Sequence, residues 1–177
     1  MHKENAIIAI DGRCAAGKST LAAVLSEKTD CCVIHTDDFF LRPSQRTPQR
    51  YEEPGGNIDR ERLLEEVMKP LSENKPFYVR SYDCRTQLLT EPVYILPQRL
   101  TVVEGSYSCH SSLWELYDLR IFLTVGREEQ RRRIEQRNGK EALTSFIEKW
   151  IPLEECYFKA YNIEKRCDLR FDTSERR

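Results

Sequence analysis

The sequence predicts an α/β fold built around a parallel β-sheet, and three observations support that prediction. Short apolar runs rich in β-branched residues alternate with segments of helical periodicity. The first apolar run is followed directly by a glycine-rich turn and then by a helical pattern. The chain has 177 residues, which is the size of one domain and enough to bury a full core. We therefore expect a single domain over residues 1–177.

The expected strands and helices alternate along the chain. Five short apolar runs are predicted to be core strands, at Ala6–Ile10, Cys32–His35, Leu100–Val103, Leu119–Val125 and Asp168–Phe171. Helices are predicted at Lys18–Lys28, Asp59–Leu71, Ser111–Tyr117, Glu128–Arg137 and Leu143–Ile163. Asp59 is a suitable N-cap for the second helix, whose apolar residues fall on one face.

Two segments interrupt this alternation. Residues 41–58 form a long connection with three prolines and two adjacent glycines, and loops of this length in a compact domain are usually functional. We interpret it as a substrate loop. Phe77–Asp83 and Val93–Leu96 look like extended pieces, and we expect them to form a small hairpin beside the main sheet.

The glycine-rich turn after the first strand has the pattern of a phosphate-binding loop, or P-loop. The chain reads GRCAAGKST there, and glycines at both ends let backbone amides wrap around a phosphate. The expected nucleotide contacts are Gly12, Arg13, Cys14, Ala15, Ala16, Gly17, Lys18, Ser19 and Thr20. Lys18 would contact the terminal phosphates, and Ser19 would offer its hydroxyl to Mg²⁺. The alternative is a glycine-rich turn that only caps a helix.

Acidic residues follow two further predicted strands. Asp37 and Asp38 come after the second strand, and Glu104 ends the third. Ligands of open α/β sheets gather at the carboxyl ends of the strands, so the turns that carry these acids should share one cleft with the P-loop. Adjacent strand residues point to opposite faces, so Asp37 and Asp38 should not share a role. We expect Glu104 to hold Mg²⁺ and Asp37 to accept a proton from a substrate hydroxyl. The alternative for each acid is a helix or turn cap.

The densest basic segment follows the fourth strand. Residues 127–139 contain five arginines, of which Arg133 and Arg137 share a helical face. We interpret this segment as a lid that lowers arginines onto a triphosphate. Ordinary salt bridges on a solvated helix are the alternative interpretation.

Composition limits the function classes. The net charge is −1, which does not favour nucleic acid or a membrane surface as a partner. The N-terminal apolar run is too short for a signal peptide, and we expect a cytoplasmic protein. The seven cysteines are scattered, so we expect them to be reduced and mostly buried. Cys14 lies beside a helix N-terminus, which could lower its pKa and favour oxidation.

The chain resembles the uridine kinase and phosphoribulokinase family of P-loop small-molecule kinases, which is close to the nicotinamide riboside kinases. The resemblance covers nearly the whole chain. It rests on GRCAAGKST, VIHTDDFF, YEEPGGNIDRERLL, VRSYDCRTQ, LTVVEGSY, the arginine-rich helix and CDLRF. It implies a P-loop NTPase three-layer sandwich with a five-stranded parallel sheet and an arginine-rich lid helix.

The resemblance also implies roles for single residues. Lys18 and Ser19 would serve ATP and Mg²⁺, Asp37 would act as base and Mg²⁺ ligand, and Glu104 would complete the metal site. Arg132 or Arg133 would occupy the first arginine position of the lid and Arg137 the next. Among these, Asp37, Lys18 and Arg133 are the predicted catalytic residues, and Arg133 would also face the substrate.

On the acceptor side, Glu52 would bind ribose hydroxyls and Tyr82 would lie beside the base. Uridine kinases have a histidine five residues after that tyrosine, whereas this chain has Gln87, which leaves the identity of the base open.

The sequence thus predicts an ATP- and Mg²⁺-dependent kinase for a hydroxyl of a small ribose-bearing metabolite, with the 5′-hydroxyl of a nucleoside as first expectation. Nicotinamide riboside, pantothenate or a nucleoside monophosphate are alternative acceptors, the last favoured by Arg46, Arg50 and Arg80. A nucleotide-binding regulatory module is the alternative without kinase activity. GTP in place of ATP and a homo-oligomeric state are compatible with the sequence.

Overall fold

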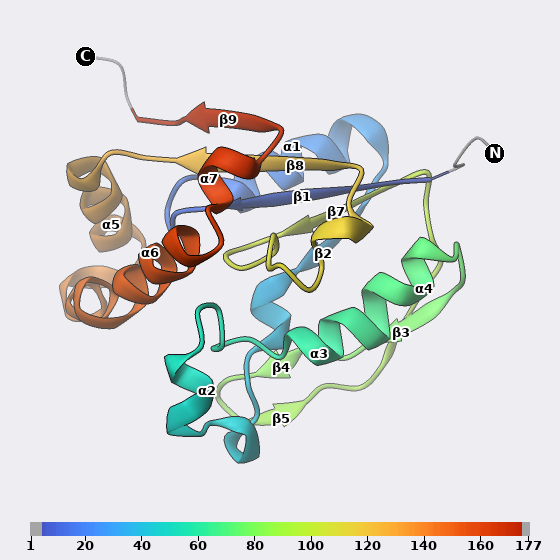
Figure 1. The fold of residues 1–177 in the computed structure, drawn as a ribbon, viewed down its shortest axis with the longest axis horizontal. Coiled ribbons are helices and arrows are strands. Elements are labelled where there is room, and N and C mark those ends of the chain that lie inside the picture. Colours follow the sequence, from blue (N-terminus) through green and yellow to red (C-terminus); the bar gives the residue numbers. More distant parts are fainter. Residues whose placement is uncertain (1–4, 175–177) are drawn as a thin grey trace.

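The computed structural model describes residues 5–174 and contains a five-stranded parallel sheet with strand order β2-β7-β1-β8-β9 (Figure 1). The strands are β1 (Ala6–Gly12), β2 (Cys32–His35), β7 (Leu100–Glu104), β8 (Leu119–Thr124) and β9 (Leu169–Asp172). Every neighbouring pair in this sheet is parallel. The predicted fold class is confirmed, and each of the five expected strands is present.

Helices cover both faces of the sheet, which gives three layers (Figure 1). On one face, α1 (Lys18–Thr29) packs Ala22 against strand residues such as Ile10 and Val102. On the other face lies the larger core, where Phe122 meets side chains from the helices that follow β2 and β8. Burial of these apolar side chains is the main stabilising contribution.

The predicted helix at 59–71 forms as one run of three consecutive segments. These are α3 (Arg60–Leu63), the π-helical η3 (Leu64–Met68) and α4 (Lys69–Ser72). Asp59 caps the run as expected, because its Oδ1 accepts a hydrogen bond from the Arg62 amide at 3.1 Å. Its apolar stripe is fully buried at Leu63, Val67, Met68 and Leu71.

Two other helix predictions were wrong in extent. Residues 111–117 form only a 3-10 turn, η4 (Trp114–Leu116), because a segment this short gains little from helical hydrogen bonds. The expected helix at 143–163 is divided. α5 (Arg127–Ser145) continues through η5 (Phe146–Trp150) into α6 (Ile151–Ala160), and α7 (Ile163–Arg166) starts separately after a left-handed Asn162. The lid boundary near residue 139 coincides with a break, since Gly139 has φ 83°.

The substrate loop at 41–58 is ordered. It contains η2 (Pro43–Gln45) and α2 (Pro48–Glu52), and an isolated bridge between Phe40 and Ile58 closes its base. Beside α3 and α4 lie two short antiparallel pairs (Figure 1). β3 (Phe77–Val79) pairs with β6 (Val93–Ile95), and β4 (Tyr82–Asp83) pairs with β5 (Leu88–Leu89). The expected hairpin region is therefore two small sheets rather than one.

The cysteines are all free thiols, as expected. The expectation that most of them are buried was only partly correct. Cys14, Cys31 and Cys109 are buried, whereas Cys84 and Cys156 are exposed. Within residues 5–174, we find no helix that is both long and apolar enough to cross a bilayer.

Candidate active site

The P-loop lies between β1 and α1, at the carboxyl edge of the sheet. Gly12 is required there because a Cβ would overlap the carbonyl oxygen of Leu123 on β8. Lys18 is buried, and its Nζ donates to the carbonyl oxygens of Gly12 at 2.7 Å and Arg13 at 3.1 Å. The loop therefore holds its lysine at the edge where phosphates are expected.

A cavity of about 630 Å³ opens above the P-loop. Its volume is within the range of small-molecule sites. It is lined by Cys14, Ala15, Gly17, Lys18, Ser19, Thr20, Asp37, Phe40, Asn57, Glu104, Gly105, Ser106, Tyr107, Arg133, Arg137, Phe146, Trp150 and Glu154. Predicted residues from the P-loop, two strand ends and the lid thus meet at one cavity.

Ser19 and Glu104 meet at one corner of this cavity, where the sequence predicts Mg²⁺. Strand register brings Glu104 beside Ile10 of β1 and His35 of β2. The Ser19 hydroxyl donates to Glu104 Oε1 at 3.0 Å, and His35 Nδ1 lies 2.6 Å from the same oxygen. This hydrogen bond to Glu104 raises the pKa of His35. A hydroxyl beside carboxylate oxygens is a donor set that fits Mg²⁺.

Asp37 opens the short 3-10 helix η1 (Thr36–Phe39) directly after β2 and lines the cavity. The carboxylate is accessible to solvent in the cavity, yet the surrounding walls desolvate it and raise its pKa, while nearby Lys18 lowers it. Desolvation is the larger effect. Asp38 is half-buried and does not line the cavity, although its backbone oxygen accepts a hydrogen bond from Arg62 at 2.8 Å.

The lid arginines differ in position. Arg133 lines the cavity and donates to the Ala15 carbonyl of the P-loop at 3.2 Å and to the Thr173 carbonyl at 2.6 Å. Arg137 also lines the cavity. Arg132 pairs with Glu129 outside the cavity wall, and its hydrogen bond and that of Arg133 lower the pKa of Glu129 to about 2. Of the two candidates for the first lid arginine, only Arg133 faces the site.

Two side chains of the P-loop, those of Arg13 and Cys14, have structural roles. Arg13 turns away from the cavity, pairs with Glu155 at 2.7 Å and Glu164 at 3.2 Å, and lies over the Phe122 ring. It fastens the P-loop to α6 and α7. The helix N-terminus does not lower the pKa of Cys14, because burial and the nearby Glu154 raise it to about 12.

The three residues expected to bind the acceptor do not line the cavity. Glu52 is exposed on α2. Tyr82 is buried, and its hydroxyl accepts a hydrogen bond from Arg46 Nη2 at 2.8 Å. Gln87 is exposed in the turn between β4 and β5 with φ 59°. The structure therefore does not place these three side chains in the cavity wall.

Other residues line the rest of the cavity and form its proposed acceptor-side wall, and sequence reasoning missed them. They are Phe40, Asn57, Ser106, Tyr107, Phe146, Trp150 and Glu154. The only local signal was the four-residue spacing of Phe146, Trp150 and Glu154, which places them on one face of a continuous helix. Because that helix was predicted as part of a longer separate element, its cavity-facing side was not recognised.

Buried Asp11 organises the turn that carries Ser106 and Tyr107. Its carboxylate accepts hydrogen bonds from the amides of Gly12 at 2.7 Å and Cys109 at 2.9 Å and from the Tyr157 hydroxyl at 2.8 Å. Burial nevertheless raises the pKa of Asp11 to about 6. Tyr107 has φ 75°, a strained conformation for a residue with a side chain. The turn is therefore held in place by its contacts with Asp11.

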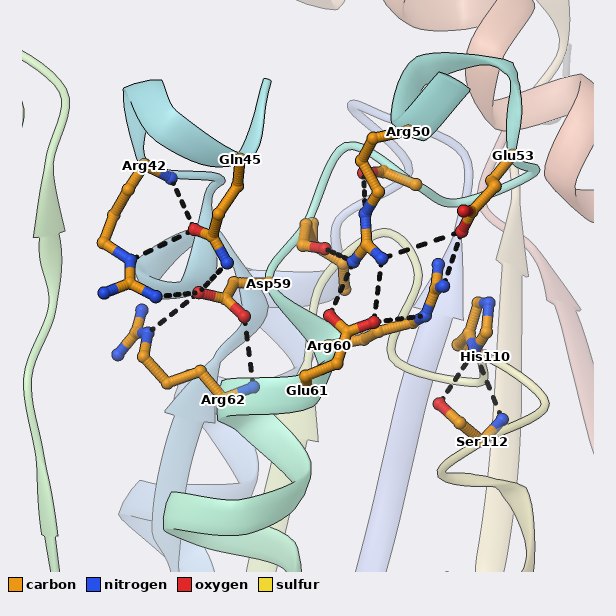
Figure 2. A network of polar contacts seen from close by, with 12 residues as sticks. Arg42, Gln45, Arg50, Glu53, Asp59, Arg60, Glu61, Arg62, His110 and Ser112 are labelled. Atoms are coloured by element: carbon orange, nitrogen blue, oxygen red, sulfur yellow. Dashed lines mark hydrogen bonds and ion pairs between the residues drawn. The ribbon is translucent and has the colours of Figure 1, made fainter. Parts of the chain in front are cut away.

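An ionic network fixes the substrate loop (Figure 2). Arg50 donates to the carbonyl oxygens of Gly56 and Ile58, each at 2.8 Å, and pairs with Glu61 at 2.7 Å. Directly after the loop, the Asp59 carboxylate accepts a hydrogen bond from the Gln45 side-chain amide at 2.9 Å. These contacts hold the segment that presents Asn57 to the cavity.

Comparison with known proteins identifies relatives of this chain. No family model matches the sequence. The chain is 33% identical to human nicotinamide riboside kinase 2 over 139 residues, 75% of this chain and 57% of that protein. It is 32% identical to the mouse protein of the same name over 134 residues, 72% of this chain and 65% of that protein. The chain thus spans less than two thirds of these relatives.

Solved structures show the same fold at low sequence identity. A possible uridine kinase from Bacillus stearothermophilus matches with a TM-score of 0.74 and 21% identity, over 97% of this chain and 91% of that one. A putative fructose transport system kinase from Silicibacter matches with a TM-score of 0.71 and 18% identity, over 96% and 91%. Relatives and fold neighbours confirm the resemblance that the motifs indicated.

Proposed function

Because the chain is a homologue of the nicotinamide riboside kinases and has the fold of P-loop kinases, we propose that it phosphorylates a small ribose-bearing metabolite. The phosphoryl donor is ATP, and the proposed acceptor group is the 5′-hydroxyl of a nucleoside. One observation supports this most strongly: Lys18 and Ser19 share a single cavity with Asp37 and an aromatic wall. We place this activity in the cytoplasm.

In the proposed reaction, the P-loop amides and Lys18 bind the phosphates of ATP. Ser19, Glu104 and Asp37 would hold Mg²⁺, which when bound neutralises charge on the phosphates. Asp37, whose carboxylate lines the cavity, accepts the proton of the acceptor hydroxyl. Arg133 stabilises the transferring phosphoryl group from the lid side. Arg137 would bind the triphosphate from the same helix.

The acceptor-side wall favours a nucleoside over an acceptor that already carries a phosphate. Phe40, Phe146 and Trp150 offer apolar surface for a planar ring. Arginines that would recognise an acceptor phosphate are engaged elsewhere. Arg46 binds the Tyr82 hydroxyl, Arg50 binds Glu61, and the Nε of Arg80 donates to the Thr90 carbonyl at 2.7 Å.

The names of the relatives and the acceptors that the sequence left open give the first compounds to test. Uridine, other ribonucleosides, nicotinamide riboside, pantothenate, ribulose phosphate and nucleoside monophosphates would be incubated separately with ATP and Mg²⁺, and ATP consumption would be measured. We expect consumption with at least one nucleoside and none after Mg²⁺ is removed by a chelator. GTP replaces ATP in a parallel series.

Each negative outcome has a defined meaning. Turnover only with a non-nucleoside acceptor would overturn the proposed substrate class. Tight ATP binding without turnover of any acceptor would favour a regulatory module, which would leave Asp37 and the aromatic wall without a role.

A further inference from the structure

Glu154 is the one acid of the cavity wall that the proposed reaction does not use. It is 5% exposed and lies on α6, opposite the helix end that supplies Lys18. Its Oε2 accepts a hydrogen bond from the Cys14 amide at 2.9 Å, and its Oε1 accepts one from the Ser106 hydroxyl at 2.6 Å. Among residues 5–174, no lysine, arginine or histidine forms an ion pair with it.

A buried carboxylate without an ion-pair partner needs further hydrogen-bond donors. Its two oxygens can accept about four hydrogen bonds, and here they accept one from the Cys14 amide and one from the Ser106 hydroxyl, with the weak donor of the Cys14 thiol beside them. Desolvating an anion without a cation or a full set of donors is costly. Since Glu154 lines the cavity, a bound molecule can supply the missing donors.

A role in holding the P-loop does not explain why the side chain at this position is a carboxylate, which can carry a negative charge. A neutral amide or hydroxyl oxygen at this position could accept the same hydrogen bond from Cys14. A carboxylate beside a loop that binds phosphates is repelled by them, which makes it a poor choice for a purely structural tie. The charge is explained if donors from a second ligand approach it.

The neighbours of Glu154 indicate which ligand that is. Phe146, Trp150 and Glu154 succeed one another at four-residue steps and all line the cavity. Four helical residues rise about 6 Å, so the backbone position of Glu154 lies about one helical turn after that of Trp150. A molecule with a planar ring and hydroxyl groups attached nearby matches this order of side chains.

We propose that Glu154 binds a pair of sugar hydroxyls on the acceptor, with both carboxylate oxygens receiving hydrogen bonds. This assignment rests on the proposed function, because it concerns the acceptor of the same reaction. It makes Glu154 the residue that distinguishes ribose from deoxyribose in the acceptor.

The test compares a ribonucleoside with its 2′-deoxy and 3′-deoxy analogues as acceptors, in the wild-type protein and in Glu154→Gln. Hydrogen bonds to a charged group contribute about 1.5–3 kcal/mol, so the wild type should prefer the ribonucleoside by roughly 10- to 100-fold in kcat/KM. In Glu154→Gln, the ratio of kcat/KM for the ribonucleoside to kcat/KM for the deoxy analogues should fall toward one. The KM for ATP should change by less than about twofold. Glu148→Gln is the matched control, since Glu148 is exposed on the same helix and lies outside the cavity wall.

The outcomes separate this assignment from the proposed function. If Glu154→Gln slows the ribonucleoside and both deoxy analogues by the same factor, or raises only the KM for ATP, Glu154 holds the P-loop and the assignment is overturned. If the wild type phosphorylates no nucleoside, the proposed function itself fails. Glu154→Asp retains the charge, and it is used with the same acceptors if the glutamine variant does not fold.

Discussion

The two halves of the cavity are built differently. The proposed donor half consists of one continuous turn, GRCAAGKST, together with Glu104 at the end of the neighbouring strand. The proposed acceptor half is assembled from four separate segments, which supply Phe40, Asn57, the Ser106–Tyr107 turn and the helix face that ends at Glu154.

The two halves also differ in what holds them. Strand register fixes most of the donor half, to which Arg13 and Glu154 add side-chain contacts, whereas the acceptor half depends mainly on side-chain contacts. The substrate loop depends on Arg50, and the turn with Tyr107 depends on Asp11. The comparison teaches that binding of ATP and binding of the acceptor should respond to different substitutions.

Asp37→Asn should have the largest effect, because it removes the proposed base without touching the P-loop. We expect kcat to fall about 10²- to 10⁴-fold. The Kd for ATP, measured by titration calorimetry, should change little. Asp38→Asn is the adjacent control and should leave kcat nearly unchanged. Equal kcat values for the two variants would remove Asp37 from the base role.

Arg133→Ala should have the next largest effect. Loss of a charge-assisted hydrogen bond at the transferring phosphate corresponds to about a 10- to 100-fold fall in kcat/KM. Arg132→Ala removes the arginine beside it, which pairs with Glu129 outside the cavity, and it should change kcat/KM by less than about threefold. A larger loss from Arg132→Ala would show that the lid rotates on closing.

His110 makes the support of the acceptor half sensitive to acid. A Cβ at Gly55 of the substrate loop would lie 3.1 Å from the His110 ring, and burial together with Arg60 and Arg50 lowers the pKa of His110 to about 4. In the unfolded chain the imidazole takes up its proton near pH 6.5, so the unfolded state binds more protons between these values. The contribution of His110 to the free energy of unfolding is therefore fully present above about pH 6.5 and is lost as the pH falls toward 4.

This linkage predicts a loss of about 2 kcal/mol in the free energy of unfolding between pH 7 and pH 5. His110→Phe keeps a flat ring against Tyr157 and should remove this part of the pH dependence. Urea unfolding at several pH values measures it. Parallel pH profiles for the two proteins would contradict a neutral, buried His110.

Asn57→Ala should have the smallest of these effects. Its side chain lines the cavity and hydrogen-bonds with Tyr107, so the KM for the acceptor should rise about three- to tenfold, corresponding to about 1 kcal/mol. Gln87→Ala alters an exposed turn and should leave this KM unchanged. The opposite ranking would return the acceptor site to the residues expected from the family resemblance.

Sequence reasoning was accurate for features that follow from residues close together in the chain. The strands, the cap at Asp59 and the meeting of Lys18, Ser19, Asp37 and Glu104 follow from local patterns and from the geometry of parallel sheets. Glu154 could not be predicted in this way, because it lies 140 residues after the Cys14 amide that it binds. Its position depends on how the helix after the lid packs against the sheet.

The same limit explains Tyr82 and Gln87. Their positions in the sequence match the family pattern, but the hydrogen bond from Arg46 of the substrate loop to Tyr82 and the left-handed turn at Gln87 between β4 and β5 arise only when the chain folds. Such side-chain pairings are not encoded in the spacing of residues.

The most direct test of one shared cavity follows the γ-phosphate itself. Wild-type protein would be incubated with ATP labelled in the γ-phosphate and a ribonucleoside, and the products would be separated and identified by mass spectrometry. The proposed function predicts that the label appears in the nucleoside 5′-monophosphate and that Asp37→Asn abolishes this transfer. Label found only in inorganic phosphate, at the same rate with and without the nucleoside, would contradict it.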